Sequence, residues 1–160
     1  MAKVFSNELK AILVMEDVSS PESAVWQDKS FTVQHFSYDC CRDRNQQGEP
    51  YGATLPSFLD FTVRVSSGDS AKEFFERMYE RESFPYSFLF NARFDDQRKL
   101  SEYEDAMVAS GYIIDVLESY DNEPQPDGSS DQMLITGRLL LCHLSYLGKE
   151  NVLKLIINND

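Results

Sequence analysis

The stretch SAKEFFERMYERESFPYSFLFNARF, Ser70–Phe94, contains two different spacings of large apolar residues and decides the fold class. In Tyr86–Phe94 large apolar residues alternate with other residues, a period of two that is typical of a β-strand. In Ser70–Arg81 they recur every three or four residues, the period of an amphipathic α-helix, at Ala71, Phe74, Phe75, Met78 and Tyr79. The stretch therefore predicts one helix, stopped by Pro85, and then a core strand.

The predicted helix carries a start signal and one clear apolar face. Ser70 and Glu73 fit a capping box, in which each side chain satisfies a backbone N–H of the first turn. We expect Arg77 to lie outside the face that packs on the rest of the fold, which contains Phe74, Phe75 and Met78. One face of the following strand is predicted to carry Tyr86, Phe88, Phe90, Ala92 and Phe94.

The rest of the chain is dominated by two-residue alternation, so we expect a mostly β protein. Apolar residues occupy both faces of the first predicted strand, which indicates that both faces are covered. The predicted strands, the last of which could also be helical, are Glu8–Glu16, Phe31–Cys41, Thr54–Ser66, Tyr103–Ala109, Gly111–Tyr120, Gln132–Tyr146 and Asn151–Ile157. The predicted loops and turns are Ser19–Lys29, Arg42–Gly52, Asp95–Lys99 and Asp121–Asp131.

Length and charge limit the class of protein. The chain has 160 residues, of which 42% are hydrophobic, and this predicts a single domain over residues 1–160 with its own core. The net charge is −12, which opposes binding to nucleic acid and to anionic membranes. No signal peptide and no membrane-spanning run is readable, and we expect the chain to be made in the cytoplasm.

Histidines and cysteines are the residues of the chain that best suit a zinc site. These are His35, Cys40, Cys41, Cys142 and His143. Adjacent residues of a strand point to opposite faces, so Cys40 with Cys41, and Cys142 with His143, are badly placed to share one ion. We therefore predict reduced cysteines and neither a metal nor a cofactor, with the thiols packed as small apolar groups.

Two other features could carry chemistry. Acidic pairs at Asp95–Asp96 and Glu102–Glu104 could serve a hydrolase, although in so acidic a chain we interpret them as solvated turns. The aromatic face of Tyr86–Phe94 could line a cavity, and a monomeric β-barrel that binds a small apolar ligand is the alternative function. We predict no catalytic residue and no enzymatic activity.

The order of several motifs resembles one known family. These motifs are VQHFSY at Val33–Tyr38, a polar loop with Gly48, Pro50 and Gly52, the strand Leu59–Val65, and then Phe74–Met78, Tyr86–Phe94, Tyr103–Ala106, Glu118–Tyr120 and Gln132–Thr136. Their order and spacing over Ala11–Leu141 are similar to those of the tube protein of type VI secretion systems, called Hcp or TssD, in its Bacteroidetes-type version. The family's helix typically has Trp where this chain has Arg77, and Ser19–Lys29 looks like an insertion.

The resemblance implies a mostly β fold, a closed two-sheet β-barrel with one flanking α-helix. It implies that six copies form a ring and that rings stack into a tube that carries effector proteins and meets spike and sheath proteins. The tube would leave the cytoplasm through the type VI machinery. No catalytic residue is implied.

A ring of identical copies needs a heterologous interface, in which two different patches meet. The segment Arg42–Gly52 is long for a simple connection, and such loops are usually functional or disordered. We expect its contact residues to be Arg42, Arg44, Gln46, Gly48 and Tyr51. The alternative is that the segment is only a mobile hairpin tip.

Overall fold

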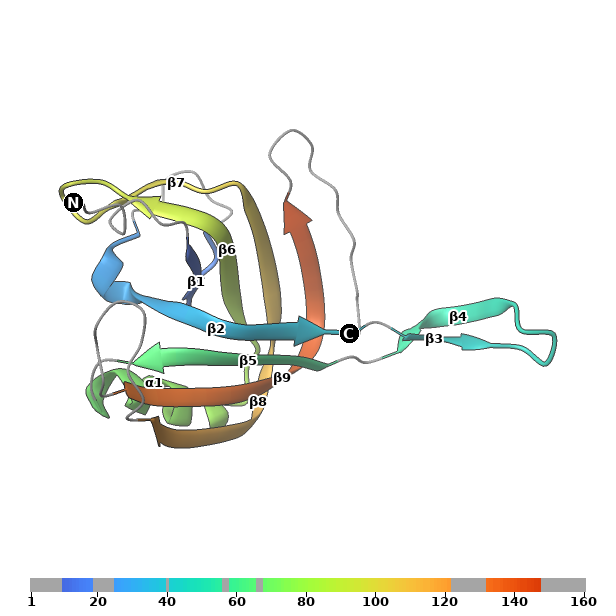
Figure 1. Cartoon of the computed structure of the whole chain (residues 1–160). Coiled ribbons are helices and arrows are strands. Elements are labelled where there is room, and N and C mark those ends of the chain that lie inside the picture. Colours follow the sequence, from blue (N-terminus) through green and yellow to red (C-terminus); the bar gives the residue numbers. More distant parts are fainter. Residues whose placement is uncertain are drawn as a thin grey trace.

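The computed structural model describes residues 10–18, 25–39, 41–55, 58–65, 68–121 and 132–147, and these form nine strands and one α-helix (Figure 1). The elements are β1 Lys10–Val14, β2 Ser30–Tyr38, β3 Cys41–Arg44, β4 Pro50–Leu55, β5 Phe58–Val65, α1 Gly68–Met78, β6 Phe84–Phe94, β7 Leu100–Glu102, β8 Asp105–Asp121 and β9 Gln132–Leu147. The mostly β prediction is confirmed. The predicted final strand Asn151–Ile157 and loop residues 122–131 lie outside the described residues.

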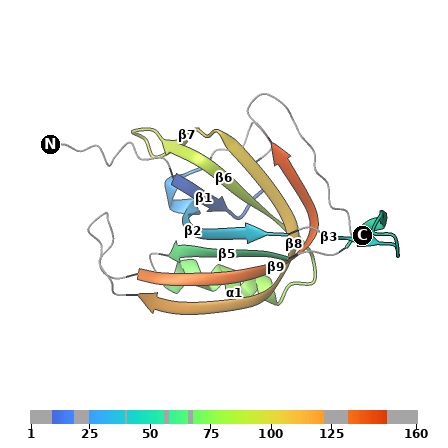
Figure 2. The same cartoon turned by 45° about the vertical axis from the view of Figure 1, so that its right-hand side comes forward.

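Six strands close into a barrel. Neighbouring strands pair in the order β1-β2-β5-β9-β8-β6, and β1 also pairs with β6, which closes the sheet. Figures 1 and 2 show the strands wrapping round a common interior, with α1 against β5 and β8. The predicted β-barrel with one flanking helix is confirmed, and its closure gives each barrel strand a partner strand on both sides over part of its length.

The helix α1 packs an aromatic residue into the barrel. Phe74 has no exposed surface, and its ring centroid lies 5.0 Å from that of Phe31 and 5.9 Å from that of Phe61. The predicted capping box is wrong because the helix begins at Gly68, so Ser70 already has a helical backbone and cannot be the N-cap.

Two further predictions about this region are corrected. The helix ends at Met78 instead of Arg81, well before Pro85. Pro85 instead lies in β6, opposite Ser110 of β8. Since the pairing of β6 with β1 starts only at Ser87, the proline has no described strand partner on its other side, and its missing N–H costs no ladder bond there.

Arg77, expected outside the packed face, points into it. Its Nη2 donates to the Met15 carbonyl at 2.8 Å, and its guanidinium lies 4.8 Å from the ring centroid of Phe84 and 5.2 Å from that of Tyr86. Met78 is 38% exposed instead. The guanidinium can be half-buried here because it contacts aromatic rings and donates to a backbone carbonyl. The spacing of apolar residues in the sequence cannot predict such contacts.

Two hydrophobic clusters lie on opposite sides of the sheet. The larger fills the barrel, and the smaller covers the outer faces of β1 and β6 beneath Val25 and Leu100. The prediction that both faces of the first strand are covered is confirmed: Leu13 belongs to the inner cluster, and Ile12 and Val14 belong to the outer one.

In strand β6, the alternation between side chains that face the barrel interior and side chains that face outward shifts at Asn91. This residue has a φ of 56°, a left-handed conformation that is uncommon outside glycine. Tyr86 and Phe88 face the barrel interior as predicted, but Ala92 and Phe94 belong to the outer cluster. The prediction of one continuous face is therefore wrong, because an irregularity of this kind shifts the alternation by one residue.

Three other boundaries differ from the predictions. The expected strands Tyr103–Ala109 and Gly111–Tyr120 form the single strand β8, whose register shifts at Gly111. A Cβ there would overlap the Leu140 carbonyl oxygen, so the close approach of β9 requires glycine. The expected strand Thr54–Ser66 is shared between β4 and β5. In the expected loop Ser19–Lys29, Gln27–Lys29 form a 3₁₀ turn, and residues 19–24 lie outside the described residues.

Candidate subunit interface

The segment predicted as the loop Arg42–Gly52 is a β-hairpin, so the loop prediction is wrong. Strand β3 pairs with β4 through Cys41 with Leu55, Arg42 with Thr54 and Arg44 with Pro50, and the register shifts between Arg42 and Arg44. Glycines, a proline and charged residues were the reason for expecting a loop. Antiparallel pairing satisfies the backbone in spite of that composition.

The tip of the hairpin, residues 45–49, is held by one asparagine. The Asn45 side-chain oxygen accepts hydrogen bonds from the backbone N–H of Gln47 at 3.0 Å and of Glu49 at 2.9 Å. The Gly48 N–H donates to the Asn45 carbonyl at 2.9 Å, and Gly48 has a φ of 86°. Asparagine and glycine are the residues that allow this turn, because one bonds its own backbone and the other tolerates positive φ.

The hairpin extends away from the barrel, as the long β3–β4 arm of Figure 1 shows. Among the described strands, β3 and β4 pair only with each other, and residues 45–49 are exposed. An isolated two-stranded hairpin is marginally stable in water. The arm therefore has the form of an element that gains from contact with another molecule.

All five predicted contact residues lie on this hairpin. Arg42 and Arg44 belong to β3 and Tyr51 belongs to β4, and the side chains of these three lie outside the described part of the structure. Gln46 and Gly48 lie at the exposed tip. The fold thus brings the five positions into one projecting element.

The charge of the hairpin is balanced in an otherwise acidic chain. Two arginines, Arg42 and Arg44, are matched by two acids, Asp43 and Glu49, so that Cys41–Leu55 carries no net charge while the whole chain carries −12. The arm therefore lacks the net negative charge by which two copies of so acidic a chain would repel each other.

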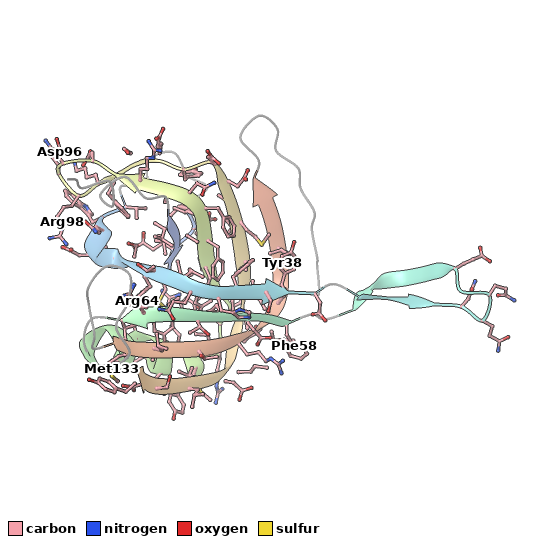
Figure 3. All side chains as sticks on the ribbon, in the orientation of Figure 1. Tyr38, Phe58, Arg64, Asp96, Arg98 and Met133 are labelled. Carbon is pink, nitrogen blue, oxygen red and sulfur yellow. The ribbon has the colours of Figure 1, made fainter. Side chains whose placement is uncertain are left out.

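Sequence reasoning missed an aromatic and charged group at the base of the hairpin. Phe58 and Tyr38 are 38% and 37% exposed, and Figure 3 shows both beside the point where the hairpin leaves the barrel. Arg138 Nε donates to Asp60 Oδ1 at 2.9 Å, and its guanidinium lies 4.9 Å from the Phe58 ring centroid. Hydrogen bonding to Asp60 raises the pKa of Arg138. Only the register of β5 against β9 brings these residues together, so no single-strand pattern could reveal them.

The candidate metal ligands are spread over different strands. His35 lies on β2, whereas Cys142 and His143 lie on β9, and β5 separates these two strands. Cys40 and the side chain of Cys41 lie outside the described residues. Within the described part of the chain, no group of three or more His, Cys, Asp or Glu side chains is placed to hold a metal ion. The absence of a metal remains a prediction.

The acidic pairs have structural partners. Asp95 Oδ1 accepts the backbone N–H groups of Gln97 and Lys99, which confirms the predicted turn at Asp95–Lys99. Glu102 forms an ion pair with Arg93 at 3.4 Å, and Glu104 accepts a hydrogen bond from Asn91 at 2.6 Å. Three of the four paired carboxylates, those of Asp95, Glu102 and Glu104, thus have structural contacts.

The described part of the chain contains no helix that is both long enough and apolar enough to cross a membrane.

Solved structures with the same architecture identify the fold. A crystal structure of an Hcp protein aligns with 89% of this chain and 94% of its own, at 12% identity and a TM-score of 0.59. The chain has the Hcp fold. Hcp1 of Flavobacterium johnsoniae aligns with 87% of this chain and 95% of its own, at 16% identity and a TM-score of 0.56. A type six secretion system protein aligns with 86% of this chain and 82% of its own, at 9% identity and a TM-score of 0.55.

These alignments cover 86–89% of this chain and 82–95% of the solved structures, at sequence identities of only 9–16%. A scan against protein-family models and a search of curated proteins found no match to the sequence. The likeness to these solved structures is therefore one of fold.

Proposed function

We propose that this chain is a structural subunit of a type VI secretion tube, which self-assembles into hexameric rings that stack and carry effector proteins. The observation that carries the proposal is the agreement of fold with Hcp proteins over 87–89% of this chain and 94–95% of theirs.

The filled barrel supports a structural role over the alternative of a monomeric barrel that binds a small apolar ligand. The rings of Phe61, Phe74 and Phe88 occupy the interior, with the centroid of Phe61 5.9 Å from that of Phe74 and 6.0 Å from that of Phe88. All three have at most 1% of their surface exposed. Ligand-binding barrels instead keep a cavity of several hundred Å³, whereas this interior is a packed core.

The projecting hairpin supplies the heterologous contact that a ring or stack requires. In this proposal Arg42, Arg44, Gln46, Gly48 and Tyr51 contact a neighbouring copy. Exposed ion pairs contribute only about 0–1 kcal/mol each, so the arginines act through repetition around the ring. Tyr51 contributes by burying its ring at the contact.

The further partners follow from the same assignment. Effector proteins would occupy the channel of the ring, and spike and sheath proteins would meet the end and the outside of the tube. The chain would be made in the cytoplasm and exported by the type VI machinery. An enzymatic role is not part of the proposal, because three of the four paired carboxylates already form a turn, an ion pair or a hydrogen bond.

The mass of the protein in solution tests the proposal. Native mass spectrometry over a range of concentrations is expected to show six copies of 18.4 kDa, about 110 kDa in total. A strict monomer at high concentration contradicts the assembly. Displacement of a bound hydrophobic dye by lipids from such a monomer would favour the ligand-binding alternative.

A further inference from the structure

An exposed tryptophan lies at the end of the barrel opposite the hairpin. Trp26, Asp28, Arg98 and Lys99 form this surface, which we call the end patch. Figure 3 shows Arg98 and Asp96 on the far side of the barrel from the hairpin, whereas Tyr38 and Phe58 lie at the hairpin base. The turn before β7 lies away from the hairpin in the rotated view of Figure 2 as well.

The end patch is held in place by backbone pairing between two distant segments. The Gln27 N–H donates to the Arg98 carbonyl at 2.9 Å, and the Leu100 N–H donates to the Val25 carbonyl at 2.9 Å. Trp26 and Lys99 form an isolated β-bridge between these bonds. The backbone on which the tryptophan stands is therefore fixed before any partner arrives.

The side chains of the end patch are also ordered and yet accessible. Trp26 is 38% exposed, and the Lys99 ammonium lies 4.8 Å from its ring centroid. Arg98 forms an ion pair with Asp28. Arg98 also has a φ of 66°, a backbone conformation that favours glycine, so this position keeps a long cationic side chain at a conformational cost. A partly exposed tryptophan beside an arginine has the composition of a binding hot spot.

The charge of this end matches that of the hairpin. Residues 25–30 and 93–102 contain four basic residues and four acidic residues, so they carry no net charge. Cys41–Leu55 is neutral too, and the entire charge of −12 therefore lies elsewhere in the chain. For copies of a strongly acidic protein, two neutral surfaces are the places where contact meets the least repulsion.

We infer that the end patch of one copy receives the β3–β4 hairpin of a second copy, an inference that rests on the proposed self-assembly. Two different surfaces at opposite ends of one subunit meet head to tail when successive copies share one orientation, which is a heterologous contact. The uncharged tip residues Gln46, Gln47 and Gly48 would cover the Trp26 ring, and the Glu49 carboxylate would face Lys99.

A photo-crosslinking residue at the hairpin tip tests the location of the contact. Gln47 is replaced by p-benzoylphenylalanine in ¹⁵N-labelled protein, which is mixed with unlabelled unmodified protein before irradiation. Cross-linked peptides are expected to join the labelled tip to unlabelled peptides that contain Trp26 or Lys99. Cross-links from assembled protein to any other surface, or to an unrelated protein, overturn this inference and leave the self-assembly intact. A chain that stays monomeric overturns both.

A substitution series tests the energetic role of the tryptophan. Trp26→Ala is expected to raise the concentration needed for copies to associate end to end by about tenfold or more, whereas Trp26→Phe, which keeps a ring, loses less. Tyr79→Ala is the matched control, because Tyr79 is 83% exposed but lies just after α1. Circular dichroism is expected to stay the same for all three. Equal association of Trp26→Ala and Tyr79→Ala, with both folded, contradicts the inference.

Discussion

The barrel and the hairpin of this chain differ in how their strands pair and in how much of their surface is described as buried. In the barrel, strands pair on both sides and enclose a core in which Leu59, Phe61 and Val63 have no exposed surface. In the hairpin, two strands pair only with each other among the described strands, and the tip is exposed. The barrel contains the contacts that stabilise it, whereas the hairpin is an arm whose stability depends on what it touches.

This difference separates stability from assembly. Changes in the barrel core should alter the free energy of unfolding, and changes in the hairpin should alter association while leaving the barrel intact. Substitutions in the barrel and in the hairpin should therefore differ widely in their effect on barrel stability.

Removing the aromatic residue of α1 should have the largest effect. Phe74→Ala deletes a ring that contacts Phe31 and Phe61, and it is expected to cost about 3–5 kcal/mol of the free energy of unfolding. Met78→Ala on the same helix is the control, and since Met78 is 38% exposed its cost should be far smaller. Urea unfolding measures both. Similar costs for the two variants would show that the helix does not pack as described.

Two glycines, one in the barrel and one in the hairpin, should differ in how much their replacement by alanine lowers barrel stability, and both effects should be smaller than that of Phe74→Ala. A Cβ at Gly137 would overlap the Phe61 ring, so Gly137→Ala is expected to cost about 1–3 kcal/mol through forced repacking of the barrel. A Cβ at Gly48 would have nothing within 4 Å, and only its φ of 86° opposes substitution. Gly48→Ala should therefore strain the hairpin tip without moving the urea midpoint of the barrel. A loss of barrel stability in Gly48→Ala would mean that the two regions unfold as one unit.

We expect the buried Tyr86 to lower the free energy of unfolding at alkaline pH. Burial raises the pKa of Tyr86 above its ordinary value of 10.0, although the neighbouring Arg77 acts in the opposite direction. The neutral phenol is thus favoured in the folded protein, so its stabilising contribution is complete below pH 10. It is lost as the pH rises from there through the folded pKa, at up to about 1.4 kcal/mol per pH unit.

Comparison of two phenylalanine variants isolates that contribution. Tyr86→Phe is expected to unfold with a shallower alkaline loss than the parent, measured by urea titrations between pH 9 and 11. Tyr103→Phe, at a residue that is 38% exposed, should keep the slope of the parent. If both variants keep that slope, the Tyr86 phenol does not contribute to the pH dependence.

The sequence was more informative about the barrel than about the hairpin, and the reason is burial. Alternation in Phe58–Val65 and the stripe around Phe74 reflect faces that are hidden from water, and such faces must be apolar. Arg77 was misplaced because its burial depends on the carbonyl of Met15, 62 residues away. Ala92 was assigned to the wrong face because the positive φ of Asn91 leaves no signal in an apolar pattern.

The candidate interface shows the same limit more strongly. The five residues on the hairpin were predicted from the length of the segment and, mostly, from the family resemblance, and they remain a prediction. The hairpin strands carry no alternation and were predicted as a loop. The tip, residues 45–49, is exposed, so nothing there requires the apolar side chains by which a buried strand is recognised in a sequence. Similarly, the end patch forms by pairing between Trp26 and Lys99, which are far apart in the sequence and share no pattern.

The smallest effect on the barrel is expected from removing the hairpin tip. Deletion of Arg44–Gly48 removes the turn held by Asn45 and leaves the pairs of Cys41 with Leu55 and Arg42 with Thr54 at the base. Because no barrel strand pairs with β3 or β4 among the described residues, the far-ultraviolet circular dichroism and the urea midpoint should match those of the parent. Association should instead weaken. A second variant with five Gly and Ser residues in place of Arg44–Gly48 keeps the length of the hairpin but removes its side chains. If this variant assembles like the parent, the length of the hairpin matters for assembly and the named side chains do not. If the deletion itself assembles like the parent across a range of salt concentrations, the hairpin is only a solvated tip and its assignment as an interface is wrong.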